Sequence, residues 1–413
     1  MSDTRRDFLK TTVASSGMVA WGGAVPTFLG RTAAAAPANG RPGSADTILV
    51  VVELTGGNDG LNTVIPFKDP EYAKLRPTLR LPVGQLHKVG DDLGLHPSLG
   101  GFAELLQDGK LCVVQGVGYP NPTQSHFRSM DIWQAGSTAD VLTEGWLGKA
   151  LKRLPAGTQS FHLKAANQTS PLAFEGAPAR VPSIASLAEF QLQSVAASRA
   201  DRTAQTRVRE EAVKPAGGPS LLDFVSRTAA NTYASSRRLS EIGKNYQPKA
   251  TYPNTPLATR LRLAAQLIDA GIGARLFYVS IDGFDTHATQ APAHANLLTQ
   301  VSGAVTAFFK DMNARGHGDR VLVMTFSEFG RRAQENGSRG TDHGSGSQLF
   351  LVGGKVKAGV VGAHPSLTDL PLGNLAFHTD FRQVYAAVLD RWLGVTSKEI
   401  LGEAFTPAQV FRG

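Results

Sequence analysis

The sequence contains a single cysteine, Cys112, among its 413 residues. One cysteine excludes an internal disulfide, and a metal site built from several thiolates is excluded by the same count. Cys112 lies inside the apolar run 111–114, which is typical of a buried, unreactive thiol.

A large excess of charge of one sign is also missing. The chain has 42 Lys and Arg against 34 Asp and Glu, a formal net charge of +8. The basic residues are spread along the chain and do not form the block that is typical of nucleic-acid-binding proteins. We therefore expect no nucleic-acid partner and only a weak general attraction to anionic ligands.

The N-terminal apolar stretch is too short and too polar for a membrane anchor. Residues 13–29 contain several glycines and serines and one proline. The paired arginines Arg5 and Arg6 precede the stretch, and small residues after it offer a cleavage site behind Ala35. This pattern is typical of a twin-arginine signal. We expect residues 1–35 to direct export through the twin-arginine translocase, giving a periplasmic or otherwise extracytoplasmic protein without a stable membrane anchor.

The rest of the chain has the pattern of a single α/β domain. A Gly/Pro-rich linker at 36–46 leads to residues 47–54, a β-branched run typical of a strand buried on both faces. Similar runs alternate with helical spacing up to residue 413, which predicts a doubly wound, mostly parallel sheet with helices on both faces. An Ala-, Ser- and Arg-rich region predicts a helical excursion at about 190–250. The other predicted strands and helices are 111–115, 275–281, 320–326 and 349–352, and 97–108, 257–270, 291–314 and 381–393.

Acidic residues and histidines lie next to three of these predicted strands. Asp285 and His287 follow one strand, Glu328 follows the next, and Asp342 and His343 precede the last. Because parallel strands bring their carboxyl ends to one edge of a sheet, these side chains are expected to meet there. Carboxylates and neutral imidazoles suit Zn²⁺, Mn²⁺ or Fe. The pattern predicts a polar or metal site in which a metal activates water and stabilises negative charge.

Two further positions each have two interpretations. Asp59 lies in the turn 56–60, where Asn-Asp-Gly favours left-handed backbone, and its carboxylate is also placed to bind a metal. Ser125 lies at a predicted helix start. Its hydroxyl either caps the helix or acts as a nucleophile, beside N–H groups that hold a phosphate or sulfate oxygen. Thr123 is an alternative nucleophile. His126 gives weak support for a Ser–His pair, since adjacent helical residues face different directions.

Together these motifs resemble the large exported bacterial family known as domain of unknown function 1501, which is placed among the alkaline phosphatase- and sulfatase-like folds. The resemblance extends from the export signal to the C-terminus. The motifs that carry it are 56–62 (GGNDGLN), 125–127 (SHF), 283–287 (GFDTH), 327–331 (SEFGR), 340–344 (GTDHG) and 380–382 (DFR).

The resemblance implies an alkaline phosphatase-like fold and a metal-dependent hydrolase of phosphate or sulfate esters. The divalent metal would be Zn, Mn, Fe, Mg or Ca, bound at the carboxyl edge of the sheet. The residues implied as metal ligands are Asp59, Asp285, His287, Glu328, Asp342 and His343. The residues implied in catalysis are Ser125 and His126, and those implied in binding an anionic substrate are Asn58, Arg128 and Arg331.

The sequence departs from the superfamily pattern at two places. The strand-end acid–His pair is Glu328-Phe329 here, so one imidazole is missing. Asp285 and His287 are two residues apart, where phosphatases commonly use four. The Cys-x-Pro-x-Arg signature of formylglycine sulfatases is also absent. The alternative function is therefore a non-catalytic member of the fold, which binds a glycan, an anionic small molecule or a partner exported with it.

Overall fold

The computed structural model describes residues 46–165, 168–187, 243 and 245–412. The predicted signal at 1–35, nearly all of the predicted linker at 36–46 and most of the helical excursion predicted at 190–250 lie outside the described residues. Within the described part of the chain, no helix combines the length and the apolar character needed to cross a membrane.

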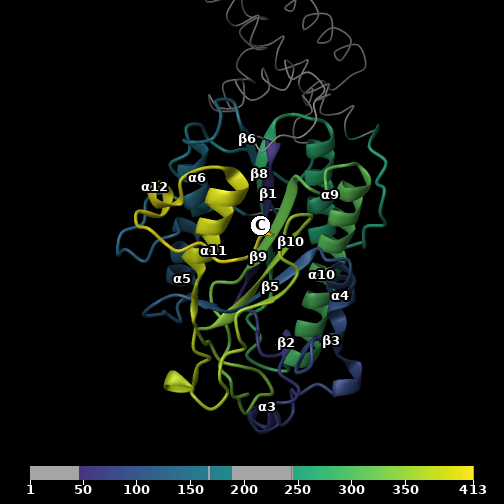
Figure 1. The fold of residues 1–413 in the computed structure, drawn as a ribbon, viewed down its shortest axis with the longest axis vertical. Coiled ribbons are helices and arrows are strands. Elements are labelled where there is room, and N and C mark those ends of the chain that lie inside the picture. The colour runs from purple at the N-terminus through teal and green to yellow at the C-terminus, as the bar shows by residue number, and fades with distance from the viewer. Residues whose placement is uncertain (1–45, 166–167, 188–242, 244, 413) are drawn as a thin grey trace, which may run out of the picture.

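A nine-stranded sheet forms the centre of the fold (Figure 1). Its strands are β1 (Ile48–Thr55), β5 (Leu111–Gly118), β6 (Gln159–Leu163), β7 (Ser183–Ile184), β8 (Ala274–Asp282), β9 (Val321–Phe326), β10 (Ser347–Gly353), β11 (Gly359–Val361) and β12 (Thr379–Asp380). The order is β11-β5-β10-β9-β1-β8-β6-β7, and β12 also pairs with β5. Of the described strands in this sheet, β10 alone runs antiparallel to its neighbours.

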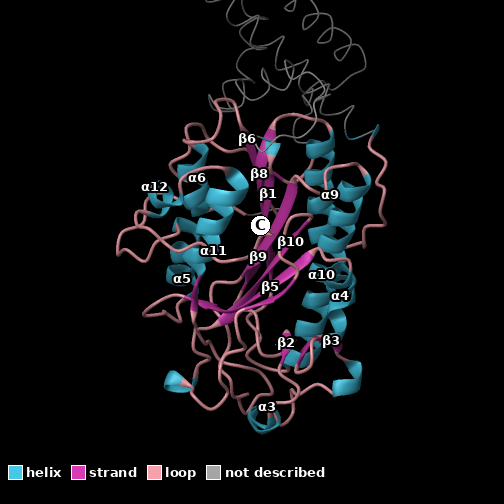
Figure 2. Ribbon diagram, viewed as in Figure 1, coloured by secondary structure: helices cyan, strands magenta, loops and turns pink. Residues whose placement is uncertain are grey.

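Helices cover both faces of this sheet (Figure 2). One face carries α4 (Gly100–Gln107), α9 (Pro256–Asp269) and α10 (Gln290–Ala314). The other carries α5 (His126–Ala135), α6 (Trp146–Leu151), α11 (Phe381–Ala387), the π-helical turn Val388–Leu393 and α12 (Ser397–Leu401). In β1, Val50 and Val52 pack on the first face while Leu49 and Val51 pack on the second. Burial on both sides explains the continuous apolar run and confirms the predicted α/β, doubly wound, mostly parallel fold.

A smaller layer lies beyond one end of the large sheet. It contains β2 (Val64–Ile65), β3 (His87–Val89) and β4 (Leu93–Leu95), which form an antiparallel sheet, and α3 (Pro70–Leu75). Short 3₁₀ turns occur at Val83–Gln85, Pro97–Leu99, Leu172–Phe174 and Pro371–Gly373. The helix predicted at 97–108 thus begins as a 3₁₀ turn, and the one predicted at 381–393 ends as a π-helical turn.

Three buried histidines are expected to make the fold sensitive to acid. Burial lowers the pKa of His96, His162 and His294 from the usual 6.5 to about 4. The unfolded chain therefore takes up these protons near pH 6.5 and the folded protein only near pH 4. We expect the free energy of unfolding to fall over this interval, by up to roughly 3 kcal/mol per histidine.

Urea unfolding at pH 7 and pH 4.5 measures this dependence. The free energy of unfolding of His294→Asn should fall less between pH 7 and pH 4.5 than that of the parent, whatever its value at pH 7, because the variant lacks one titrating group. An equal loss in the variant and the parent would contradict this explanation.

Candidate metal site at the carboxyl edge of the sheet

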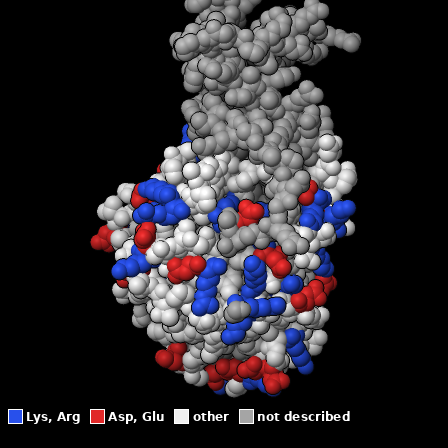
Figure 3. Space-filling view, turned by 45° about the horizontal axis from the view of Figure 1, so that its top comes forward, with Lys and Arg blue, Asp and Glu red and all other residues white. Residues whose placement is uncertain are grey.

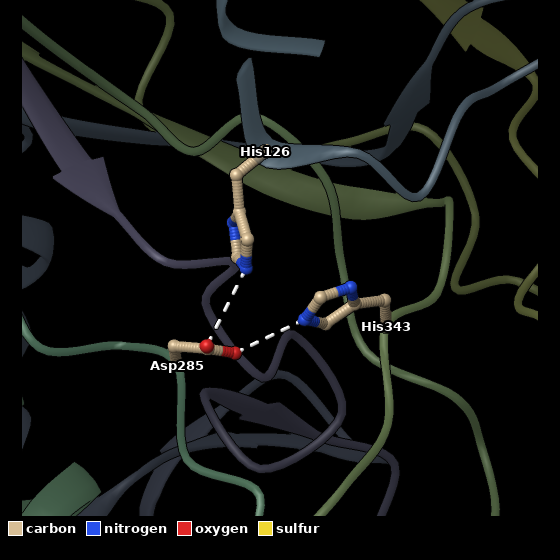
Figure 4. A group of neighbouring side chains, drawn as sticks. All are labelled: His126, Asp285 and His343. Carbon is tan, nitrogen blue, oxygen red and sulfur yellow. Dashed lines mark hydrogen bonds and ion pairs between the residues drawn. The ribbon is translucent and has the colours of Figure 1, made fainter. Parts of the chain in front are cut away.

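Four side chains from three separate segments meet beyond the carboxyl ends of the parallel strands. His126 is the first residue of α5, which follows β5, while Asp285 and His287 follow β8. His343 precedes β10, which begins at this edge because it runs antiparallel. Figure 4 shows His126, Asp285 and His343 pointing toward one another from different elements. The structure therefore brings together Asp285, His287 and His343, as the strand-end pattern predicted.

Asp285 lies at the centre of this group. Its Oδ1 is 2.9 Å from His287 Nε2 and 3.1 Å from His343 Nε2, and its Oδ2 is 3.4 Å from His126 Nε2. One ligand atom from each of His126, Asp285 and His343 lies within 4.8 Å of the others. All three imidazoles thus direct the same ring nitrogen toward one carboxylate. Because the side chains of Asp285 and His287 are 46% and 45% exposed, the group is open to solvent.

The opposite ring nitrogen, Nδ1, faces an acceptor in each of the three imidazoles. The acceptors are Glu328 Oε1, 2.8 Å from His126, the Gln124 carbonyl, 2.9 Å from His343, and Asp342 Oδ1, 3.5 Å from His287. Carboxylate and carbonyl oxygens accept, so we assign the proton to Nδ1, which leaves a lone pair on Nε2. Metal-binding histidines are held in this way, with the second nitrogen bonded to a carboxylate or carbonyl.

Two features of the Nε2 atoms fit a shared cation. His287 Nε2 lies 2.9 Å from His343 Nε2. If both protons are on Nδ1, two lone pairs face each other at this distance, an arrangement that a shared cation would stabilise. The buried Nε2 atom of His126 has no hydrogen-bond partner. Both observations fit a divalent metal ion bound by His126, His343 and Asp285, with His287 Nε2, 2.9 Å from Asp285 Oδ1, beside them.

The charges around the site keep Asp285 ionised. Partial burial acts to raise the pKa of Asp285, but the hydrogen bond from Arg331 and the charge of its guanidinium act against burial, and the pKa is lowered to about 2. The hydrogen bond to Glu328 raises the pKa of His126 above its usual value, with burial acting in the opposite direction. Protons should therefore compete with a metal for His126 as the solution becomes acidic.

Glu328 lies behind His126 and does not face the centre of the group. It is fully buried, and its Oε1 accepts from the Gly56 N–H at 2.8 Å as well as from His126. Its Oε2 accepts from Ser327 Oγ at 3.1 Å. With both oxygens engaged, Glu328 orients an imidazole, and we correct its predicted role as a direct metal ligand.

Glu328→Gln is expected to weaken Zn²⁺ binding by about 10- to 100-fold, because a neutral amide is a poorer acceptor for the Nδ1–H of His126. Competition with a chromogenic chelator measures the affinity. Glu335→Gln is the matched control, since Glu335 accepts hydrogen bonds from Thr78 and Leu79 away from the histidines. Equal affinities for Glu328→Gln and the parent would contradict the orienting role.

Asp59 does not join the histidines. Its Oδ2 lies 2.5 Å from Arg76 Nη1 and its Oδ1 lies 2.9 Å from Arg76 Nη2, and the side chains of both residues are fully buried. Gln290 also donates to Asp59 Oδ2. Burial acts to raise the pKa of Asp59, but the Arg76 guanidinium outweighs it and lowers the pKa to about 2. Asp59 is therefore half of a buried ion pair, and we correct its predicted role as a metal ligand.

The three residues predicted to bind substrate are all engaged within the protein. Asn58 is 1% exposed and accepts from His294 Nε2 at 2.9 Å. Arg128 donates to the carbonyls of Ala139 and Asp140. Arg331 is 1% exposed and donates to Asp285 and to backbone carbonyls. Asn58 and Arg331 are thus buried in contacts within the protein, and the predicted contact of Arg128 with substrate stays a prediction.

Ser125 is the N-cap residue of α5 and is exposed, and its side chain makes no capping hydrogen bond. Its N–H donates to Thr123 Oγ1 at 3.2 Å. The choice between Ser125 and Thr123 as nucleophile stays a prediction. His126, expected to act with Ser125, instead directs Nε2 toward Asp285 and Nδ1 toward Glu328.

Asp342, predicted as a metal ligand, lies behind His287, where it also accepts from Asn336 Nδ2 at 3.0 Å. The sequence reasoning missed one residue that contacts the group. Gln124 was not identified, although its Nε2 donates to the His343 carbonyl at 3.1 Å. His126 was predicted to act in catalysis beside Ser125, but it follows the apolar strand β5, as Asp285 and His287 follow β8, and this signal indicates a ligand at the same edge.

Comparisons with known proteins agree with the motifs. The model of the family described as "Protein of unknown function (DUF1501)" matches residues 46–400. A search of curated proteins gives no match. Similar solved structures include the C-terminal periplasmic domain of EcEptC from Escherichia coli in complex with Zn (10% identity, 77% of this chain and 74% of that chain, TM-score 0.38).

Two further similar structures come from other bacteria. They are the phosphonate monoester hydrolase of Agrobacterium radiobacter (10% identity, 87% of this chain and 78% of that chain, TM-score 0.36) and the lipoteichoic acid synthase LtaP from Listeria monocytogenes (10% identity, 93% and 79%, TM-score 0.34). Likenesses at these identities and TM-scores carry no conclusion about activity. The match of the family model covers most of the chain, and it shows that the protein belongs to the DUF1501 family.

Proposed function

We propose that this protein is a metal-dependent hydrolase of phosphate or sulfate esters. The observation that carries the proposal is the convergence of three Nε2 atoms on Asp285, each imidazole being held through Nδ1 by an acceptor. Three imidazoles and a carboxylate form a ligand set suited to Zn²⁺ and to related divalent ions. Their place beyond the carboxyl ends of parallel strands is where α/β proteins bind ligands.

The residues of the site divide into holding and orienting groups. A divalent ion held by His126, His287, His343 and Asp285 would supply an activated water molecule or a positive charge for developing negative charge. Arg331 keeps Asp285 ionised, and Glu328 holds the His126 ring in the orientation that exposes Nε2. These contacts fix the site before substrate arrives, which lowers the cost of reorganisation during the reaction.

The substrate class rests on the sequence motifs and on α5. The motifs resemble those of the DUF1501 family, which is placed among the alkaline phosphatase- and sulfatase-like folds, and proteins of these folds act on phosphate and sulfate esters. Ser125 adjoins the N-terminus of the ten-residue helix α5, where the helix dipole favours an anionic group. We assign Ser125 as the attacking nucleophile, with its exposed hydroxyl next to the metal-facing His126.

The test uses protein loaded with Zn²⁺ or Mn²⁺ and three substrates: p-nitrophenyl phosphate, bis(p-nitrophenyl) phosphate and p-nitrophenyl sulfate. We expect hydrolysis of at least one of them, abolished by His343→Ala and lowered by at least about 100-fold in Ser125→Ala. Hydrolysis that is unchanged in Ser125→Ala would contradict the nucleophile. A metal-loaded protein that hydrolyses none of the three would contradict the proposed activity.

A non-catalytic function is the second candidate, and two observations favour it. Phe329 stands where the superfamily has a histidine, and the predicted substrate-binding side chains Asn58, Arg128 and Arg331 are engaged in contacts within the protein. Such a protein would bind an anionic small molecule or a glycan without turning it over. A rise in thermal stability with the uncleaved ester, without release of product, distinguishes this function from catalysis.

We also propose that the protein works outside the cytoplasm after twin-arginine export, on the basis of the N-terminal pattern. Replacement of both Arg5 and Arg6 by lysine should hold the precursor in the cytoplasm, because the translocase reads the arginine pair. Fractionation of cells that produce the full chain measures the distribution. Export of the double variant at the rate of the parent would contradict this route.

A further inference from the structure

The guanidinium of Arg331 lies against the same carboxylate as the three imidazoles. Its side chain is buried, and Nη2 lies 2.6 Å from Asp285 Oδ1. Nε donates to the Gly57 carbonyl at 2.7 Å, and Nη1 donates to the Thr341 carbonyl at 2.9 Å. Nη2 also donates to the carbonyls of Gly56 and Phe284. A guanidinium stays charged in proteins, so this fork places a fixed positive charge inside the site.

We propose that Arg331 takes the place of a second metal ion, so that the site binds one divalent ion per chain. The inference rests on the proposed metal site and adds its stoichiometry and the role of Arg331. Sites with two metals hold the ions about 3.5–4 Å apart and share carboxylates between them. Here Arg331 Nη2 already donates to Asp285 Oδ1, and the charge of the guanidinium repels a second cation from this oxygen.

The neighbouring buried carboxylates are not available to a second ion. Both oxygens of Asp59 accept from Arg76. Both oxygens of Glu328 accept from protein donors, including His126. The groups that face the centre are therefore three imidazoles and Asp285, which is the ligand number of one tetrahedral site.

The balance of charge leads to the same stoichiometry. Among groups in direct contact with the imidazoles or with Asp285, one divalent ion and Arg331 carry three positive charges, which match the negative charges of Asp285, Glu328 and Asp342. A second divalent ion would leave two positive charges uncompensated in a partly buried site, which costs free energy.

Metal analysis of the parent protein after dialysis against Mn²⁺ tests the stoichiometry directly. We expect saturation at one ion per chain and the six-line electron paramagnetic resonance spectrum of an isolated Mn²⁺ ion. Saturation at two ions per chain with an exchange-coupled spectrum would overturn the inference and leave the metal-dependent function standing. If no Mn²⁺ or Zn²⁺ binds, the metal site itself is overturned, and the inference with it.

Variants of Arg331 test its role as the fixed cation. Arg331→Lys should keep one ion per chain, whereas a folded Arg331→Met protein should take up a second, weakly held ion at high Mn²⁺ concentration, because Asp285 Oδ1 is then open to it. Arg332→Met is the matched control, because the side chain of Arg332 is exposed, and it should keep one ion per chain. One ion per chain in folded Arg331→Met, with unchanged affinity, would overturn the proposed role. If Arg331→Met does not fold, the parent stoichiometry and Arg331→Lys decide the question.

Discussion

His343→Ala is expected to lower the affinity for Zn²⁺ by at least about 100-fold, more than the 10- to 100-fold typical of losing an outer partner. The variant removes an Nε2 atom that lies 3.1 Å from Asp285 and 2.9 Å from His287 Nε2. Competition with a chelator on the purified, folded protein measures the change.

Without metal, the free energy of unfolding of His343→Ala should lie within about 1 kcal/mol of that of the parent, because replacements at partly exposed positions destabilise a protein little. A separate histidine provides the control. His378→Ala should leave Zn²⁺ affinity unchanged, because His378 Nε2 instead lies 2.7 Å from the Ala363 carbonyl. Equal Zn²⁺ affinities for His343→Ala and the parent would contradict the assignment of this imidazole as a ligand.

Arg76→Met is expected to destabilise the protein by about 3–5 kcal/mol, the largest effect on stability in this account. The substitution leaves the Asp59 carboxylate buried without its cation, and it removes the hydrogen bonds from Arg76 to the carbonyls of Arg332 and Ala333. Urea unfolding at pH 7 measures the loss.

The double variant Arg76→Met with Asp59→Asn should recover part of this loss, because the uncompensated charge is then gone. Asp59→Glu is not a suitable control, since a longer acid would have to fit the same buried space. A loss below about 1 kcal/mol in Arg76→Met, or a double variant less stable than it, would contradict the explanation from buried charge.

The fold was predictable because its core elements leave a strong periodic signal. The run 47–54 is buried on both faces, so it is apolar at every position except Thr47 and Glu53, and the observed β1 spans Ile48–Thr55. The helix expected at 257–270 is observed as α9, Pro256–Asp269. The sequence did not predict the short strands β6, β7, β11 and β12 or the small sheet of β2, β3 and β4. Other differences lie at element ends, where the 3₁₀ start at Pro97–Leu99 and the π-helical turn at Val388–Leu393 depend on packing that a local pattern does not contain.

The site was predictable in part, for a physical reason. Asp285, His287 and His343 adjoin strands that reach one edge, so position along the chain is sufficient to bring them together. Which carboxylates remain free depends on cations that approach from elsewhere in the fold. The pairing of Asp59 with Arg76 comes from a helix terminus 17 residues away and has no signal in the local sequence.

The structure does not test the prediction that the chain has no nucleic-acid partner. Basic and acidic side chains both occur on the face drawn in Figure 3. The expectation that the chain has no nucleic-acid partner came from the spread of Lys and Arg along the sequence, and it stays a prediction.

Anomalous diffraction from a crystal of the Zn²⁺-loaded protein, measured at the zinc absorption edge, tests the central claim most directly. We predict one peak per chain, about 2.0–2.2 Å from Nε2 of His126, His287 and His343 and from a carboxylate oxygen of Asp285. A zinc peak elsewhere on the chain, and none at these four side chains, would contradict the claim.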